Sequence, residues 1–247
     1  MKTAILTDLH ANREAVQAVL EHAADQQAQD YALLGDFVGY GADPGWVVDR
    51  VRELVQQGAR AVMGNHDRAT ILGPSPGMRL EPRQVIEWTR AQLDPEQMDF
   101  LASLPLTDET PERLYVHANA WAPADWGYIL GRFDAVRSLH ATRARLTFCG
   151  HVHEPRLYHL SRLGRAGDFV PTPGVPITLL TQRRWLVIPG SVGQPRDGDP
   201  AACYAMHDTA AGTLTFWRVP YDHDSAAARI HAAGLPRALG ERLALGV

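Results

Sequence analysis

The sequence predicts an α/β protein in which a mainly parallel sheet of the first half packs with a strand-rich second half. Strand-like and helix-like segments alternate three times at the start of the chain, which is typical of βαβ units. Beyond about residue 155, short β-rich runs are separated by Gly and Pro turns, as in an antiparallel meander. A length of 247 residues suits one large core, so we expect a single domain over residues 1–247.

The first half is predicted to alternate apolar, β-branched strands with helices whose apolar positions recur at helical spacing. Asn12 is placed to cap the first helix, and Pro44 stands near the start of the second. In chain order the segments are a strand at 3–7, a helix from Asn12, strands at 31–34 and 60–63 around a helix at 44–57, helices at 82–93 and 95–104, a strand at 113–117, a helix at 133–142 and a strand at 145–149.

The second half is predicted to consist of short strands followed by a terminal helix. The strands are expected at 155–160, 176–180, 184–188, 202–208 and 213–219. Residues 161–175 form an insertion-like loop in this interpretation, and an Ala-rich helix starts near Ser225.

Composition excludes some classes of protein. The net charge of −4 gives no overall attraction to nucleic acid or to an anionic membrane. Cys149 and Cys203 lie in apolar runs, where free thiols behave as small hydrophobic groups. The apolar run at the N-terminus is too short for a signal segment, and no stretch has the length of a membrane span, so a cytoplasmic protein is expected.

Polar residues of one chemical kind follow the strands of the first half. Residues just past the carboxyl ends of strands in an open α/β sheet meet in one crevice. A set of buried carboxylates and imidazoles is costly unless paired or bound to metal, and ligands of this kind without thiolates suit Mn, Fe, Zn, Ni or Co. The residues concerned are Asp8, His10, Asp36, Asn65, His66, Asp67, His117, His151 and His153.

The motifs DLH, GDFVGYG, GNHD, VHA and GHVH, in this order, resemble the calcineurin-like metallophosphoesterase superfamily and, within it, the small prokaryotic phosphoesterases. The resemblance runs from Asp8 to His153 and implies a four-layer αββα sandwich of two mixed β-sheets flanked by helices. It also implies that two divalent or trivalent metal ions are bound, drawn from Mn, Fe, Zn, Ni or Co.

Carried over residue by residue, the resemblance implies that one metal is bound by Asp8, His10 and His153, and the other by Asn65, His117 and His151. Asp36 would bridge both ions, and His66 would face the leaving group as a catalytic residue, with Gly64 needed for a sharp exit of the backbone. Two ions about 3.5–4 Å apart can hold a water between them and make hydroxide available at neutral pH. A protonated His66 would then neutralise the departing oxygen.

The expected reaction is hydrolysis of a phosphodiester or phosphoanhydride in a small phosphorylated substrate, a nucleotide such as a diadenosine polyphosphate. Asn12 and Arg196 lie in loops that can reach a phosphate. Three aromatic residues follow His117, and they either form one wall of the substrate cleft or pack in the core. They are Trp121, Trp126 and Tyr128. Asp67 either orients His66 or caps the following turn.

Other functions stay open at this point. A phosphomonoesterase is one alternative, and a protein phosphatase is disfavoured because Gly39 and Tyr40 stand where protein phosphatases of this superfamily have an Asp-Arg pair. A nuclease would use the arginine cluster, which reads more simply as solvated surface, so neither nucleic acid nor a membrane is an expected partner. A non-catalytic scaffold on the same fold is the third alternative. The cluster comprises Arg132, Arg137, Arg143, Arg145 and Arg156.

Overall fold

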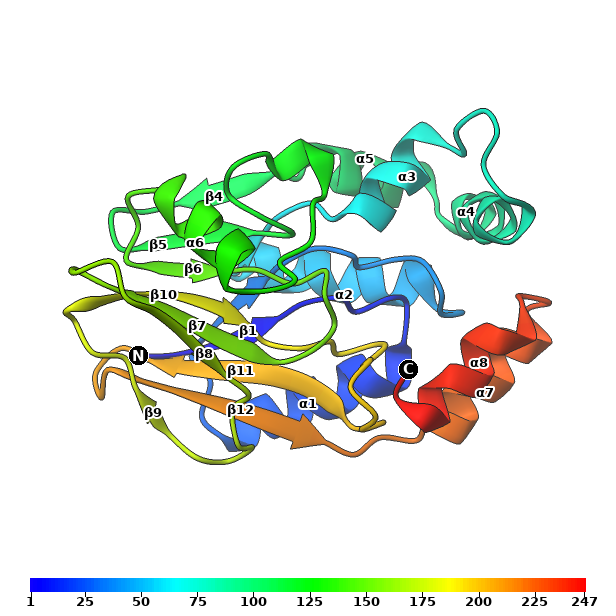
Figure 1. Ribbon diagram of the computed structural model, residues 1–247. Coiled ribbons are helices and arrows are strands. Elements are labelled where there is room, and N and C mark those ends of the chain that lie inside the picture. Colours follow the sequence, from blue (N-terminus) through cyan, green and yellow to red (C-terminus); the bar gives the residue numbers. More distant parts are fainter.

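Two six-stranded β-sheets pack face to face, and helices cover their outer sides (Figure 1). The computed structural model describes residues 1–247. The strands are β1 (Lys2–Leu6), β2 (Asp30–Leu33), β3 (Arg60–Ala61), β4 (Thr107–Glu109), β5 (Arg113–Val116), β6 (Leu146–Phe148), β7 (Arg156–Ser161), β8 (Ala166–Phe169), β9 (Ile177–Thr178), β10 (Arg183–Ile188), β11 (Ala202–Asp208) and β12 (Thr213–Val219). The helices are α1 (Arg13–Asp25), α2 (Pro44–Gln56), α3 (Asn65–Leu72), α4 (Leu80–Gln92), α5 (Pro95–Ser103), α6 (Arg132–His140), α7 (His223–Ala232) and α8 (Arg237–Leu245).

Each sheet mixes parallel and antiparallel strands. One sheet has the order β3-β2-β1-β11-β12-β9, and the other has the order β4-β5-β6-β10-β7-β8. Strands β1, β2 and β3 are parallel, as are β5, β6 and β10, whereas β11 runs antiparallel to β1 and β7 antiparallel to β10. The predicted four-layer αββα sandwich of two mixed sheets is therefore confirmed.

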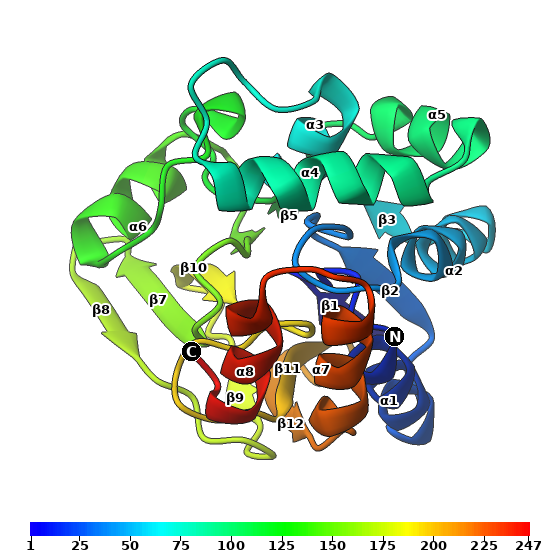
Figure 2. The ribbon, with the colours of Figure 1, turned by 90° about the vertical axis from the view of Figure 1, so that its right-hand side faces the viewer.

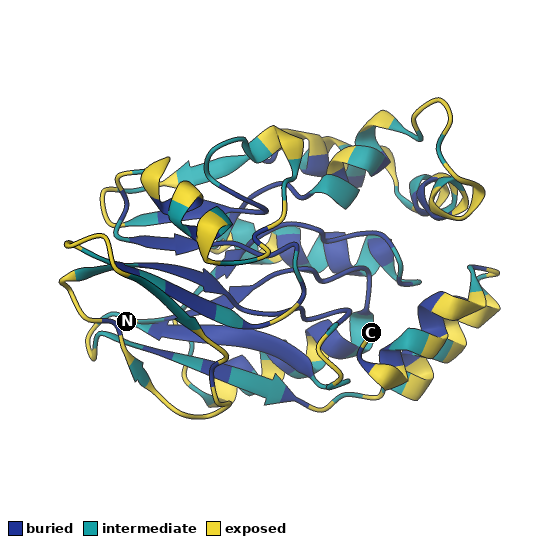
Figure 3. Cartoon of the chain, in the orientation of Figure 1, coloured by how far each residue is buried: buried dark blue, intermediate teal, exposed yellow.

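Side-chain alternation along the strands fills the layers. In β1, Ile5 packs between the two sheets with residues such as Phe148, while Ala4 and Leu6 face the layer that contains α1 and α2. On the outer face of the other sheet, Leu186 packs with Leu139 of α6. The central strands are accordingly buried, whereas the edge strands β4, β8 and β9 are partly exposed (Figure 3). A strand with both faces covered can be uniformly apolar, which explains the apolar runs in the sequence.

The prediction of one antiparallel meander after residue 155 is wrong, because the strands of this half are divided between the two sheets. Strands β8, β7 and β10 join one sheet, whereas β11, β12 and β9 join the other. Within each group the strands are antiparallel, as expected, but β11 pairs with β1 and β10 pairs with β6. Strand-like runs and turns reveal local hairpins, whereas these two pairings depend on partners far away in the sequence.

Four further features differ from the sequence prediction. Helix α3 begins at Asn65, where the sequence prediction has no helix. It buries only Asp67 and Thr70, so no apolar periodicity marks it. The insertion-like loop contains β8, which pairs with β7, and β4 is an additional short strand beside β5. The single terminal helix is in fact the pair α7 and α8.

Two expectations from composition can be compared directly with the structure. Cys149 and Cys203 are both free and buried, as the apolar runs around them predict. None of the helices combines the length and the apolar character needed to cross a bilayer.

The C-terminal helices α7 and α8 pack over the end of the sandwich and reach toward α4 (Figure 2). A small separate core holds them there, in which Val85 of α4 packs with Ile230 of α7 and with Leu239 and Leu243 of α8. Its neighbours include Tyr40, which lies in the loop after β2. The hairpin therefore closes against the loops that follow the first strands.

Candidate metal centre

The polar residues that follow five strands converge at one end of the sandwich. These residues lie directly after β1, β2, β3, β5 and β6, as the crevice at the carboxyl ends of parallel strands requires. Their side chains form adjoining groups whose possible ligand atoms lie within 4.8 Å of one another, among them Asp8, His10 and His153, and Asp36, His117 and His151. The groups that the resemblance implies are thus brought together.

The first group is held by imidazoles with fixed orientations. His10 Nδ1 lies 3.2 Å from Val38 O, and His153 Nδ1 lies 2.6 Å from Gln194 O, so each Nδ1–H donates to a carbonyl and each Nε2 keeps its lone pair. The two Nε2 atoms are 3.1 Å apart, and His153 Nε2 is 3.2 Å from Asp8 Oδ1. Three acceptor atoms therefore face one another.

The second group repeats this arrangement. His117 Nδ1 lies 2.7 Å from Leu34 O, which leaves Nε2 to face the other members. His117 Nε2 is 3.0 Å from Asn65 Oδ1 and 3.2 Å from His151 Nδ1. Asp36 Oδ2 lies 3.3 Å from His117 Nε2 and 3.9 Å from His10 Nε2. Asp36 therefore stands between the two groups, as a bridging residue would.

The donor set fits a bound cation. Ligands at about 2.1 Å from one metal ion stand about 3 Å from each other, which matches the spacing of the facing nitrogens. Asp8 Oδ1 is buried and has no hydrogen-bond partner, although Asp8 Oδ2 accepts from Thr7 Oγ1 and His151 N. An unpaired buried carboxylate oxygen is costly unless an ion binds it. These observations support metal binding by both groups.

The electrostatics favour the metal-binding forms of His10, His151 and Asp36. Burial lowers the pKa of His10 and lowers that of His151 to about 4, so both imidazoles are neutral near pH 7. Burial raises the pKa of Asp36, but the imidazoles of His117 and His66 outweigh it and hold that pKa well below the usual range. Burial lowers the pKa of His117, but the Asp36 carboxylate outweighs it and raises that pKa to about 9. Neutral imidazoles and ionised carboxylates are the forms that bind metal ions.

Backbone strain is concentrated in the same place. Asp8, His10, Asp36, His151 and His153 all have φ in the left-handed region, at 55°, 47°, 53°, 70° and 66°. Such conformations cost of order 1–3 kcal/mol each, and they persist where the surrounding structure enforces them, most often at functional sites. The strained loops place these side chains toward a common centre.

His66 stands beside both groups. Its backbone N–H donates to Asp36 Oδ1 at 2.8 Å, and its ring lies edge-on to His10, with centroids 5.0 Å apart. The His66 ring is also 4.5 Å from Tyr40. His66, His10 and Asp36 are close enough to form a third candidate ligand group, so the assignment of His66 to the substrate rather than to a metal is a proposal.

Gly64 is required for a reason other than the expected sharp exit. Its φ and ψ are −99° and 173°, an extended conformation open to any residue. A Cβ atom at this position would overlap Asp36 Oδ1 and Asp36 N. The glycine therefore allows the loop after β3 to approach the candidate bridging carboxylate.

Replacing Gly64 by alanine is expected to displace Asp36 and to destabilise the fold by about 1–3 kcal/mol, because the backbone cannot yield without moving the carboxylate. Thermal unfolding and metal content measure the two effects. Gly131→Ala is the matched control, since Gly131 has an extended φ of −175° and an added Cβ would meet nothing within 4 Å. Unchanged metal content in Gly64→Ala would contradict this role.

Asp67 ties two of the site loops together. Its carboxylate accepts hydrogen bonds from Asp36 N, Phe37 N and Val38 N and, at the start of α3, from Gly64 N at 2.9 Å. Of the two interpretations of Asp67, the structure shows the cap, and it adds bonds to the loop after β2. The one sequence signal for this cap is an acidic residue three positions after Gly64.

Asn12 and Arg196 differ in what their polar groups contact. Asn12 Oδ1 caps α1 by accepting from Ala15 N, and Asn12 Nδ2 donates to Gly193 O and Tyr221 OH, so its amide is engaged within the protein. The Arg196 guanidinium bonds Gln194 Oε1 and lies 5.8 Å from the Tyr40 ring. Arg196 is thus the better placed of the two to meet a phosphate.

Two of the three aromatic residues after β5 adjoin the second group. The Tyr128 ring stacks on His151 with centroids 4.0 Å apart, and Trp126 lies edge-on to His117 at 5.9 Å. Trp121 instead packs under the Arg137 guanidinium, 4.5 Å away. Tyr128 and Trp126 therefore form one wall of the site.

The predicted arginine cluster is largely paired with acidic residues. Arg132 and Arg156 both bind Asp168, and Arg145 binds Glu112. Such pairs leave less free charge for a phosphate backbone, so no observation favours the nuclease alternative.

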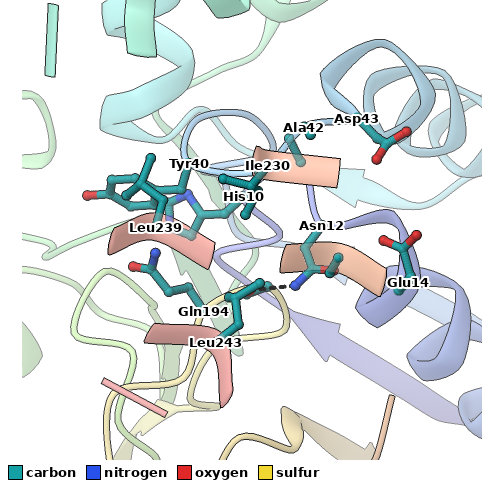
Figure 4. Close-up of a pocket in the computed structure, with 14 residues that line it drawn as sticks. His10, Asn12, Glu14, Tyr40, Ala42, Asp43, Gln194, Ile230, Leu239 and Leu243 are labelled. Atoms are coloured by element: carbon teal, nitrogen blue, oxygen red, sulfur yellow. Dashed lines mark hydrogen bonds between the residues drawn. The ribbon is translucent and has the colours of Figure 1, made fainter. Parts of the chain in front are cut away.

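The helices of the C-terminal hairpin cover one side of the first group. Around a cavity of about 10 Å³ beside His10, Ile230 of α7 and Leu239 of α8 lie next to Tyr40 (Figure 4). Asn12 and Gln194 lie on its polar side. His10 is thereby shielded from solvent, and only 1% of its surface is exposed.

Comparisons with known proteins agree with this geometry. Residues 1–212 match the calcineurin-like phosphoesterase superfamily domain, and the chain belongs to that superfamily of metal-dependent phosphoesterases. The crystal structure of a metallophosphoesterase from Sphaerobacter thermophilus is 36% identical with a TM-score of 0.89, covering 100% of this chain and 99% of that one.

Two further relatives are uncharacterised. A protein of Methanocaldococcus jannaschii is 34% identical over 250 residues, covering 98% of this chain and 97% of that protein. The structure of a hypothetical protein from Pyrococcus horikoshii is 18% identical with a TM-score of 0.79, covering 100% and 98% of the two chains, and it supports the fold alone. The superfamily assignment identifies this chain as a hydrolase.

Proposed function

We propose that the protein is a dinuclear metal-dependent phosphoesterase that hydrolyses a phosphodiester or phosphoanhydride in a small substrate, with a nucleotide as the expected class. One observation carries the proposal: two ligand groups share Asp36 and lie beside His66. The 36% identical metallophosphoesterase from Sphaerobacter thermophilus supports it independently. The same geometry favours an enzyme over a scaffold, because every residue that the resemblance requires is present.

In this proposal Asp8, His10 and His153 hold one ion, Asn65, His117 and His151 hold the other, and Asp36 contacts both. When bound, the ions supply positive charge for the phosphoryl oxygens and activate a water at neutral pH. The set of oxygen and imidazole ligands suits Mn, Fe, Zn, Ni or Co. His66 donates a proton to the leaving oxygen, and Arg196 binds a phosphoryl oxygen from the side of Tyr40.

We also infer that residues 1–247 act as one metallophosphoesterase domain. Strands β10 and β11 from the second half lie beside β6 and β1 from the first half, so neither sheet is complete without both halves. Gln194 of the second half, in addition, holds His153 in place through its carbonyl.

Metal binding is expected to stabilise the fold. An ion at a thousandfold excess over its Kd adds about 4 kcal/mol per site to the free energy of unfolding, provided that the unfolded chain does not bind it. Thermal unfolding of metal-free protein, with and without added Mn²⁺, measures this increase. Asp36→Asn should show a smaller rise in Tm, and an equal rise in both proteins would argue against binding at this site.

Substrate class is tested with the metal-loaded protein. Bis-para-nitrophenyl phosphate reports a diesterase, para-nitrophenyl phosphate a monoesterase and diadenosine tetraphosphate an anhydride hydrolase. The proposal expects turnover of the diester or the anhydride in preference to the monoester. Turnover of the monoester alone would instead favour the phosphomonoesterase alternative.

A further inference from the structure

A larger cavity adjoins the proposed catalytic site on the side of His66. It has a volume of about 340 Å³, within the range of small-molecule sites, and it lies between α3, α4 and α8. Asn65 and His66 line it directly, so it is continuous with the second ligand group. Figure 2 shows α4 and the hairpin of α7 and α8 facing each other across this side of the molecule. We call this cavity the α4–α8 pocket.

The walls of the α4–α8 pocket are mainly apolar. Ala69 of α3, Val85 and Ile86 of α4, and Leu239 of α8 are among its lining residues. Glu81 of α4 and Arg242 of α8 are the only fully charged side chains in the lining, and their charges are opposite. A lining of this kind is complementary to an apolar group that carries no net charge.

We propose that the α4–α8 pocket binds the leaving group of the substrate, and that this group is an uncharged alcohol with an apolar body. The inference rests on the proposed function, because it takes His66 as the acid that protonates the leaving oxygen. Since His66 lines the pocket, the oxygen that it protonates lies at the mouth and the rest of the alcohol extends inward. The substrate is then an ester of such an alcohol.

The charged residues of the lining favour an ester over an anhydride as the substrate. The leaving group of an anhydride is itself a phosphate, which needs several cations or N–H donors. Apart from the acid His66 at the mouth, Arg242 is the one cationic side chain of the pocket, and Glu81 offsets it. Arg196, which we place on the phosphoryl side, is not part of the lining. Helix α8 lies beyond residue 212, where the match to the superfamily domain ends, so this wall lies outside the matched domain.

The test compares kcat/KM of the Mn²⁺-loaded protein for the diesters methyl 2-naphthyl phosphate and methyl phenyl phosphate and for the anhydride ADP. The two aryl esters have leaving groups of similar basicity but different apolar area, so the naphthyl ester is expected to be about tenfold better. Ala238→Phe places a ring inside the pocket from an exposed position of α8 and should abolish this preference. Ala244→Phe, at an exposed position of α8 outside the lining, is the matched control and should keep it.

Equal naphthyl-to-phenyl ratios in the wild type and Ala238→Phe would overturn the inference, as would faster hydrolysis of ADP than of both esters. If no substrate is hydrolysed with any metal, the proposed function fails, and equilibrium binding of 2-naphthol tests the pocket separately. Binding that Ala238→Phe weakens at least tenfold and Ala244→Phe does not change would support a site for an apolar group. Absent or unaltered binding would overturn it.

Discussion

Replacing Asp36 by asparagine is expected to lower kcat by about 10³-fold and to remove at least one metal ion from each chain. Asp36 Oδ2 lies within 4 Å of both His117 Nε2 and His10 Nε2, so this one carboxylate serves both ligand groups. An amide keeps a hydrogen-bond acceptor for the His66 N–H but loses the negative charge that both ions need. Metal analysis and diester turnover of the purified variant measure the two effects.

Asp99→Asn is a suitable control for the charge change, because Asp99 is exposed on α5, away from the site. This variant should keep the wild-type metal content and turnover. If Asp36→Asn retained two ions and lost less than about tenfold in kcat, Asp36 would not bridge the two groups.

The second large effect is expected for His66→Ala, with kcat falling by about 10² to 10⁴ while both metal ions stay bound. The physical reason is loss of the proton that neutralises the leaving oxygen. A weakly basic leaving group such as para-nitrophenolate departs with less help from an acid. The loss should therefore be smaller for para-nitrophenyl esters than for esters of alkyl alcohols.

His140→Ala is the control, because it removes an exposed imidazole at the end of α6. This variant should hydrolyse para-nitrophenyl esters and alkyl esters at the wild-type rates. Metal analysis of His66→Ala is the decisive readout. His66 lies close enough to His10 and Asp36 to serve as a ligand, so loss of an ion in this variant would identify it as one. An equal loss of rate for all leaving groups would also contradict the assignment as an acid.

The positions of the candidate ligands could be predicted from the sequence because each follows an apolar run directly. Once a run is assigned as a parallel strand, its carboxyl end and the residues after it have a known place. Asp8, Asp36 and His117 are of this kind, and the structure brings them together. What each of them binds stays a prediction until a metal is measured.

Other features of the fold and the site could not be predicted, because they depend on contacts between residues that are distant in the sequence. The need for glycine at position 64 comes from Asp36, a residue of another loop, and not from the turn in which the glycine lies. Asp67 likewise takes three of its four backbone donors from the loop after β2. The pairing of β11 with β1 and of β10 with β6 brings together strands far apart in the sequence.

The C-terminal hairpin was the least predictable part. The Ala-rich tail gives a weak helical pattern, which predicts a helix but neither its division into α7 and α8 nor its packing partner. That partner is Val85 of α4 together with the loop of Tyr40, and the contact creates the α4–α8 pocket. The residues proposed here to select the leaving group therefore emerge only from the three-dimensional arrangement.

The central claim is that the two groups sharing Asp36 bind two catalytic ions. Titration of metal-free protein with Mn²⁺, with bound metal and diester turnover followed in the same samples, tests it most directly. The account predicts two ions per chain, no turnover without metal, and full activity only when both ions are bound. Saturation at one ion with full activity, or two bound ions without turnover of any phosphoester, would contradict it.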